Sequence, residues 1–146
     1  MRRALLFEPL IIGGPVLGRA QAHFERRPSN IVAAIISRGN RLVPELVTAA
    51  CTTAGVQPRA IDLLITNQPN PIFLRNWREA LELPPAAHHD TFDRLGNLFG
   101  AGIPINLADA LAQGKLARGG LLALGGFSHA GDYAAAALVR WPGVAA

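Results

Sequence analysis

A short apolar stretch that ends in polar residues constrains the fold more than any other part of the chain. Residues 61–65 are mostly Ile and Leu, and Thr66–Asn70 (Thr-Asn-Gln-Pro-Asn) follows at once. An apolar run of this length, ended by Asn and Pro, is typical of a buried parallel strand that delivers a polar loop at its carboxyl end. Ligands bind at that edge of open α/β sheets. We therefore expect the functional site there.

A second stretch repeats this design. Residues 88–92 are predicted to form a strand, which leads through Asp93–Asn97 into a helix start rich in small residues. The carboxyl ends of parallel strands meet at one edge of a sheet. We therefore expect Asn67 and Asn97 to lie close together.

Strand and helix patterns alternate along the rest of the chain. Residues 3–7 and 16–24 read as extended segments, followed by a polar connection at 25–30. From residue 31 we expect strand 31–36, helix 40–54 with Asn40 as its N-cap, strand 61–66, helix 71–83, strand 88–92, helix 103–113, strand 119–127 and strand 133–141. This order, β-α-β-α-β-α-β-β, predicts an α/β fold with a mixed, mostly parallel sheet.

Composition narrows the class of protein. Half of the 146 residues are hydrophobic and 16% are charged, which fits one globular domain. The net charge of +4 comes from scattered basic residues, so nucleic-acid binding is not favoured. The single cysteine, Cys51, excludes an internal disulfide and favours the cytoplasm. Glu8 and Pro9 interrupt the apolar start too early for a signal peptide, and no apolar run reaches the ~18 residues of a membrane span.

Four motifs occur in an order and at spacings that one known family shares. Thr66–Asn70 stands where that family has Pro-His-Gln-Ala-Asn, and residues 95–101 (Leu-Gly-Asn-Leu-Phe-Gly-Ala) resemble its His-Gly-Asn-Thr-Ser-Ala-Ala. Residues 125–127 (Gly-Gly-Phe) and 136–141 resemble its Gly-rich loop and closing strand. The chain thus resembles the C-terminal half of the β-ketoacyl-acyl-carrier-protein synthase III family, in the thiolase superfamily.

The resemblance implies a thiolase-like half over residues 31–146. Residues 1–30 would be the tail of the preceding N-terminal half, contributing two of its strands. The resemblance also implies a partner half, an acyl carrier protein as partner and a homo- or hetero-oligomer. Its substrates would be acyl thioesters of coenzyme A or acyl carrier protein, with no bound cofactor and no metal.

Two departures from the family change the expected chemistry. The family's Cys nucleophile lies in the N-terminal half, and its catalytic His is replaced here by Asn67. Asn97 matches the catalytic Asn, and Asn70 matches the last residue of the first motif. In the family, His and Asn donate hydrogen bonds to a thioester oxygen as enolate charge develops. An Asn amide can donate but cannot exchange a proton, so acyl transfer, or condensation with altered acid–base needs, stays open.

The remaining site predictions follow from position. His129, in the loop after strand 119–127, could replace the missing acid–base, and the resemblance places Asn70 and residues Gly125, Gly126 and Phe127 at the substrate. Arg75 and Arg78, one turn apart on helix 71–83, would dock the acidic carrier protein.

Each of these site predictions has a plainer alternative. Asn97 could be a turn residue, Asn67 a helix cap, His129 a surface histidine, and the two arginines a solvated helix face. His88 and His89 are adjacent on a strand and should face opposite ways, which disfavours a joint metal site. For the whole chain, one rival is a non-catalytic thiolase-like partner kept for dimerisation. A second is an unrelated α/β domain that binds a small molecule.

Overall fold

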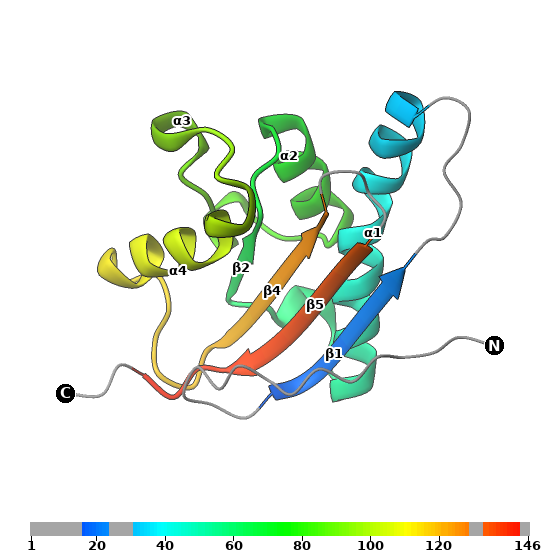
Figure 1. The fold of residues 1–146 in the computed structure, drawn as a ribbon. Helices are drawn as coiled ribbons and strands as arrows, with labels where there is room; N and C mark the ends of the chain where they lie inside the picture. Colours follow the sequence, from blue (N-terminus) through cyan, green and yellow to red (C-terminus); the bar gives the residue numbers. More distant parts are fainter. Residues whose placement is uncertain (1–15, 24–30, 129–132, 144–146) are drawn as a thin grey trace.

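The computed structural model describes residues 16–23, 31–128 and 133–143 (Figure 1). Along the chain the elements are β1 (Val16–His23), α1 (Ile31–Ala54), β2 (Leu63–Thr66), α2 (Pro71–Ala80), β3 (His88–His89), α3 (Phe92–Leu95), α4 (Gly102–Ala112), β4 (Leu121–Phe127) and β5 (Tyr133–Arg140). Short 3₁₀ turns cover Pro58–Ala60, Pro85–Ala87 and Phe99–Ala101. The extended segment expected at residues 3–7 lies outside the described residues, as does the connection at 25–30.

The five strands form one mixed sheet in the order β1-β5-β4-β2-β3. β2 runs parallel to both β3 and β4, whereas β5 runs antiparallel to β4 and β1. The α/β class and the antiparallel closing strand are therefore confirmed. Because β2 lies inside the sheet, all four of its residues are buried, as its apolar run predicts.

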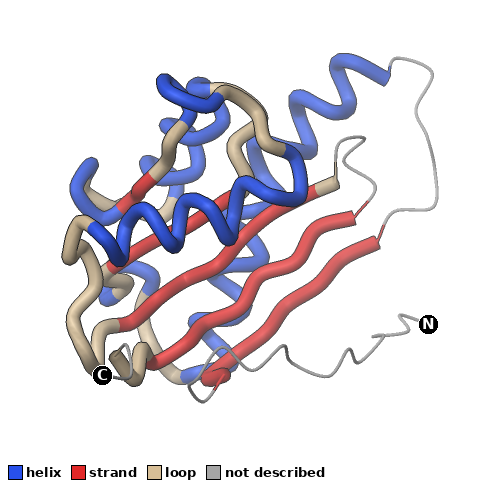
Figure 2. The backbone as a smooth tube through the Cα atoms, turned by 60° about the vertical axis from the view of Figure 1, so that its left-hand side comes forward, coloured by secondary structure: helices blue, strands red, loops and turns tan. Residues whose placement is uncertain are grey.

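Helices cover both faces of the sheet (Figures 1 and 2). α1 packs against β1, β5 and β4 on one face, with α2 beside it, and α4 packs against β2 and β3 on the other. On the α1 side, Phe73, Trp77 and Phe127 stack with ring centroids 5.6–5.8 Å apart. The apolar positions predicted at helical spacing in residues 42–51 are all buried in this core.

The prediction of a strand at residues 31–36 is wrong, because this segment forms the first turns of α1. A six-residue apolar run has no periodicity that separates a strand from a buried helix. Asn40 therefore lies inside a 24-residue helix instead of capping it, and its Oδ1 accepts a hydrogen bond from Asn76 at 2.9 Å. Pro44, expected in a first turn, lies in the helix interior.

We expected residues 16–24 to form a strand of a preceding half. The strand itself is confirmed as Val16–His23, but it pairs with β5 from Val16↔Val139 to His23↔Tyr133 and forms an edge of this sheet. The expected order of strands and helices is found once this strand takes the place of residues 31–36 and the short helix α3 is added before α4. Pairing between segments more than a hundred residues apart leaves no local pattern, so the sequence did not reveal it. The division proposed at residue 30 would cut β1 from its sheet.

The strand expected at residues 88–92 is shorter than predicted. β3 contains only His88 and His89, and α3 begins at Phe92. Between them the chain turns, and Asp90 Oδ1 accepts a hydrogen bond from Phe92 N at 2.9 Å. Asn97 consequently follows a short helix and not a strand end. Among the described residues, none of the helices has the length and apolar character needed to cross a membrane.

Candidate functional site

The side chain of Asn67 continues the ladder between β2 and β4. Its backbone N–H donates to Gly125 O at 3.2 Å. Its side-chain Nδ2 donates to Phe127 O at 3.1 Å, and its Oδ1 accepts from Phe127 N at 3.3 Å. The amide thus mimics a peptide group opposite Phe127, and these two bonds fix which end of the amide carries the oxygen. One N–H of Nδ2 is used in this pairing.

Asn97 has the opposite arrangement, in which its amide oxygen is held and its nitrogen is not. Asn97 Oδ1 accepts a hydrogen bond from Phe99 N at 2.9 Å, which turns the loop back on itself. Among the residues that the structure describes, Nδ2 has no acceptor. The half-buried Asn97 therefore presents an N–H₂ group as a donor, held by a short local turn.

A buried polar network joins the loops that carry these two residues. Gln68, next to Asn67, donates from Nε2 to the carbonyl of Gly96, next to Asn97. Its Oε1 accepts from Thr91 N at 3.1 Å and from Asn106 Nδ2 at 2.8 Å. These bonds hold the loop that follows β2 against the turn that precedes Asn97. We did not single out Gln68 or Asn106 in the sequence, although a lone Asn within the apolar helix 103–113 was a usable signal.

Asn70 is the N-cap of α2. Its Oδ1 accepts a hydrogen bond from Phe73 N at 3.0 Å, and Pro71 occupies the first helical position. The capping role weighed for Asn67 thus belongs to Asn70. A side chain committed to capping leaves only its Nδ2 group for any substrate.

The glycines of β4 permit close packing. A Cβ on Gly125 would lie 3.0 Å from Val43 and 3.2 Å from Val47, so α1 could not approach so closely. A Cβ on Gly126 would lie 3.2 Å from Asn67 Oδ1 and from Ile103. Gly126 therefore contacts the candidate site directly, whereas Gly125 faces the core under α1.

Arg75 and Arg78 lie on α2, as expected, and share one acidic neighbour. Arg75 Nε lies 4.0 Å from Glu79 Oε1, and Arg78 Nη2 lies 3.5 Å from the same atom. Arg75 is exposed, but the Arg78 side chain is only 24% exposed. Both line a hollow of about 140 Å³ that also contains the carboxylates of Asp90 and Asp93. Acidic groups therefore offset much of this positive charge.

His88 and His89 face opposite sides of the sheet, as predicted. His88 Nε2 lies 3.1 Å from Thr66 Oγ1, and burial lowers the pKa of His88 to about 4. His89 lies on the α4 side, with Nε2 2.7 Å from Asp109 and Nδ1 2.7 Å from Lys115 Nζ.

Asp109 Oδ2 lies 2.7 Å from nitrogen atoms of three side chains, those of Arg94, His89 and Gln113. Arg94 Nη2 lies 2.7 Å from its Oδ2, and hydrogen bonds from Arg94 and His89 lower the Asp109 pKa. The residues described by the structure contain no group of three side chains able to hold a metal ion. His129 lies outside the described residues.

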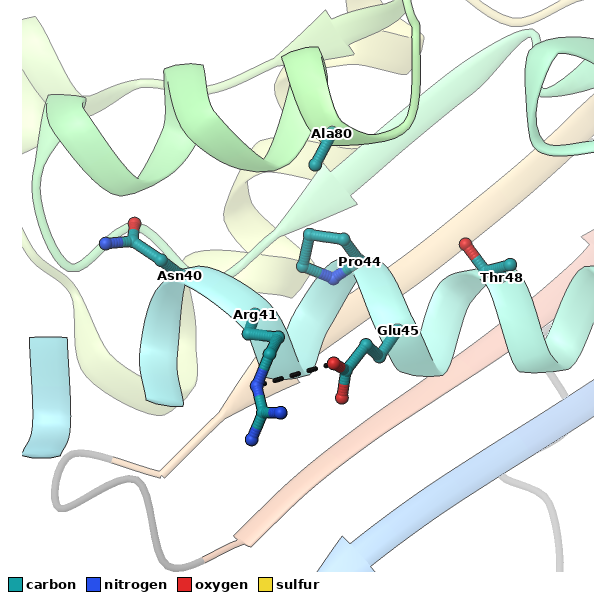
Figure 3. A pocket seen from close by; sticks show the side chains of 6 residues that line it. All are labelled: Asn40, Arg41, Pro44, Glu45, Thr48 and Ala80. Carbon is teal, nitrogen blue, oxygen red and sulfur yellow. Dashed lines mark ion pairs between the residues drawn. The ribbon is translucent and has the colours of Figure 1, made fainter. Parts of the chain in front are cut away.

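The larger surface hollow, of about 530 Å³, lies between α1 and α2 (Figure 3). It is lined by Asn40, Arg41, Pro44, Glu45, Thr48 and Ala80. Arg41 and Glu45 pair across one helical turn at 3.4 Å. None of the candidate site residues lines this hollow, so it is a feature of the helix packing apart from the strand-end loops.

A mixed sheet between helices, with two polar loops joined at one edge, defines a thiolase-like α/β domain. The chain belongs to the 3-oxoacyl-[acyl-carrier-protein] synthase III C-terminal family, whose model matches residues 51–141. It is 35% identical over 101 residues to β-ketoacyl-[acyl-carrier-protein] synthase III 1 of Halalkalibacterium halodurans. It is 36% identical over 106 residues to the β-ketoacyl-[acyl-carrier-protein] synthase III of Prochlorococcus marinus.

Solved structures support the same fold. 3-Oxoacyl-(acyl carrier protein) synthase III from Pseudomonas aeruginosa matches 90% of this chain with a TM-score of 0.79 and 23% identity. The corresponding enzyme from Aquifex aeolicus matches 88% with a TM-score of 0.78 and 23% identity.

These matches cover only part of the known proteins. The chain spans 32% and 30% of the two curated relatives, matching with 69% and 70% of its own residues. It spans 45% of each of the two solved structures.

Proposed function

We propose that this chain provides the C-terminal half of a ketoacyl synthase III-like acyltransferase. In this proposal, Asn97 and Asn67 stabilise charge on a thioester oxygen during acyl transfer or condensation. The Cys nucleophile comes from an N-terminal half outside these 146 residues, either in a longer chain or in a separate polypeptide. The substrate is an acyl thioester of coenzyme A or acyl carrier protein, and no metal takes part. We also propose a cytoplasmic location, because the chain contains a single cysteine, Cys51.

The observation that carries the proposal is the arrangement of the Asn97 amide. Its oxygen accepts a hydrogen bond from Phe99 N–H, which leaves Nδ2 as the hydrogen-bond donor of the group. A donor fixed in advance stabilises developing negative charge without reorganising during the reaction. The turn before Asn97 is bonded to Gln68, which follows Asn67, and this bond supports assigning both amides to one site.

Asn67 can offer fewer N–H groups to a substrate oxygen than Asn97. One of its N–H groups and its oxygen are paired with Phe127, which leaves one N–H for a substrate oxygen. An amide acts neither as a general acid nor as a general base near neutral pH, so proton transfer falls to another group or is not required. His129 is the proposed group, because it lies two residues after Phe127 in the sequence. Asn70, Gly125, Gly126 and Phe127 are proposed to line the substrate.

Carrier-protein docking through Arg75 and Arg78 is a separate part of the proposal. Both side chains are on α2, which begins directly after the first motif. The shared Glu79 reduces their net charge, so an acidic carrier must compete with that carboxylate. Assembly with the N-terminal half, and the dimer or higher oligomer that results, is proposed on the basis of the relatives' greater length.

The alternative is a non-catalytic thiolase-like partner used for dimerisation. The bonds of Asn67 to Phe127 favour it, because they give the residue at the catalytic His position a purely structural task. Under this alternative the substitution of His by Asn stabilises β2 against β4 and has no chemical consequence.

The test is Asn97→Ala in the complex with the N-terminal half. Loss of one oxyanion donor lowers turnover by about 10²–10³-fold. We expect this loss in the rate of acyl transfer, which is measured by the intact mass of the acylated Cys. Thermal stability should change little. Asn76→Ala is the matched control, since it also removes one side-chain hydrogen bond from a half-buried Asn. Full turnover in Asn97→Ala would favour the non-catalytic alternative.

A further inference from the structure

Three fully buried polar side chains meet under the candidate site. Gln68 follows β2, Thr91 precedes α3, and Asn106 lies in the middle of α4. Thr91 Oγ1 donates to Asn106 Oδ1 at 2.7 Å, and Asn106 Nδ2 donates to Gln68 Oε1 at 2.8 Å and to Thr66 O at 3.3 Å. The network thus ties together the segments that follow β2 and β3 and the helix that covers them.

The network ends on the turn that carries Asn97. Gln68 Nε2 donates to Gly96 O. Gly96 has φ +65° and ψ −156°, a conformation that residues with a side chain rarely adopt. This conformation turns the Gly96 carbonyl inward toward Gln68, and Asn97 follows directly.

Filling a protein interior with polar side chains carries a cost in desolvation free energy. A buried amide or hydroxyl that loses its partner costs the full desolvation of that group, so apolar side chains would fill the space with less risk. Fully satisfied buried networks have a different advantage, since they hold the attached backbone in one arrangement. Among the described residues, no buried side-chain nitrogen or oxygen lacks a hydrogen-bond partner.

We propose that Gln68, held by Thr91 and Asn106, is the positioning residue of the site. It fixes the Gly96 carbonyl and thereby the direction in which the Asn97 amide donates. Gln68 touches no substrate in this scheme and acts only through the turn. The inference rests on the proposed function, because it concerns the residue that this function makes catalytic.

The experiment compares Asn106→Ala with the wild-type 146-residue chain by NMR. Asn106→Ala removes the α4 tether of Gln68 without altering the turn itself. We expect the order parameter of the Asn97 side-chain N–H₂ group to fall. We also expect the Phe99 amide, which is bonded to Asn97 Oδ1, to exchange about tenfold faster with solvent.

Two internal comparisons separate positioning from general loosening. The Asn67 side-chain amide, bonded to Phe127, should keep its order parameter in Asn106→Ala. Asn76→Ala, which removes a hydrogen bond between α1 and α2, should leave both Asn97 and Phe99 unchanged. Equal loosening of Asn67 and Asn97 would overturn the proposal, as would unchanged Asn97 and Phe99 signals in a folded Asn106→Ala.

Thr91→Val and Thr91→Ser provide a second, milder pair. Val removes the hydroxyl that bonds Asn106 and Gln68, whereas Ser keeps it. We expect Val to reproduce the Asn106→Ala effect and Ser to restore wild-type behaviour. If neither Asn106→Ala nor Thr91→Val folds, the network serves the stability of the whole domain and the positioning role is rejected.

Activity in the assembled enzyme gives an independent measurement. Thr91→Val should lower kcat while KM stays within about twofold, because substrate contacts are unchanged and only transition-state stabilisation is lost. A wild-type complex without acyl-transfer activity would reject the proposed function, yet the NMR comparison would still decide the positioning role. Equal kcat in Thr91→Val and wild type would overturn the positioning role alone.

Discussion

At the scale of single residues, burial gives adjacent side chains different chemistry. His88 faces α2, where burial lowers its pKa to about 4, while His89 bonds Asp109 and Lys115 on the opposite face. Gly96 and Gly100 are likewise close in sequence, but only Gly96 has a positive φ. Such differences make single substitutions informative.

His88 should make stability depend on pH. Its folded pKa of about 4 lies below the unfolded value near 6.5, so the unfolded chain binds more protons between these values. The contribution of His88 to the free energy of unfolding is therefore complete above pH 6.5 and is lost as pH falls toward 4. Relative to His88→Gln, the free energy of unfolding of the wild type should fall by roughly 2–3 kcal/mol between pH 7 and pH 4.5. Urea titrations at both pH values measure this, and parallel curves for the two proteins would contradict it.

Gly96→Ala should destabilise the chain through backbone conformation alone. A Cβ at Gly96 meets nothing within 4 Å, so steric clash does not contribute. With φ of 65° and ψ of −156°, Gly96 lies in a region that is essentially restricted to glycine, so Ala should cost roughly 1–3 kcal/mol. Gly100→Ala is the matched control, since its Cβ also meets open space and its φ is not positive. Thermal unfolding should separate the two variants, and equal melting temperatures would refute the argument.

At the scale of elements, local signals set most helix ends and tertiary contacts set the rest. Asn70 and Pro71 start α2, and Gly55, with φ +69°, follows the end of α1. The start of α1 was mispredicted because its apolar first turns resemble a strand. β3 was predicted too long because Asp90 Oδ1 accepts a hydrogen bond from Phe92 N and the chain turns there.

Asn70→Ala should weaken α2 by about 0.5–2 kcal/mol, the range for losing an N-cap. Phe73 N would lose its side-chain acceptor. Asn70→Ser keeps a capping oxygen and should retain most of the stability. Chemical denaturation of the three proteins measures the difference. If Ala and Ser are equally destabilising, the capping bond is not the cause.

At the scale of the whole molecule, apolar side chains remain exposed along α3, the 3₁₀ turn and α4. Leu95, Phe99 and Ile105 are 49%, 59% and 38% exposed. These elements precede and follow Asn97 in the chain. Relatives of about three times the matched length have further chain with which to cover such a surface.

The isolated chain should therefore self-associate at micromolar concentration. Replacing Leu95 with Gln and Phe99 with Ser should shift it toward monomer, because both changes remove exposed apolar area. Ile72→Ser is the control, since Ile72 is 62% exposed but lies on α2, beside α1. Size-exclusion chromatography with light scattering measures the mass. A monodisperse wild-type monomer would contradict the prediction.

The sequence by itself determined the α/β class, the apolar strands and the family. These depend on local information: apolar runs of strand length, helical spacing, Asn and Pro at element ends, and motifs in a fixed order. The same information predicted Asn67 and Asn97 at one edge of the sheet, because parallel strands share the direction of their ends. Asn97 instead follows the short helix α3, which the sequence analysis did not predict.

Only the tertiary structure decided which roles these residues take. The pairing of β1 with β5, the bonds from Asn67 to Phe127, and the network of Gln68, Thr91 and Asn106 all join segments distant in sequence. A hydrogen bond between distant segments leaves no periodicity and no spacing in either segment. Residue types and local order are therefore visible in the sequence, while the partner of each polar side chain is fixed only when the elements pack.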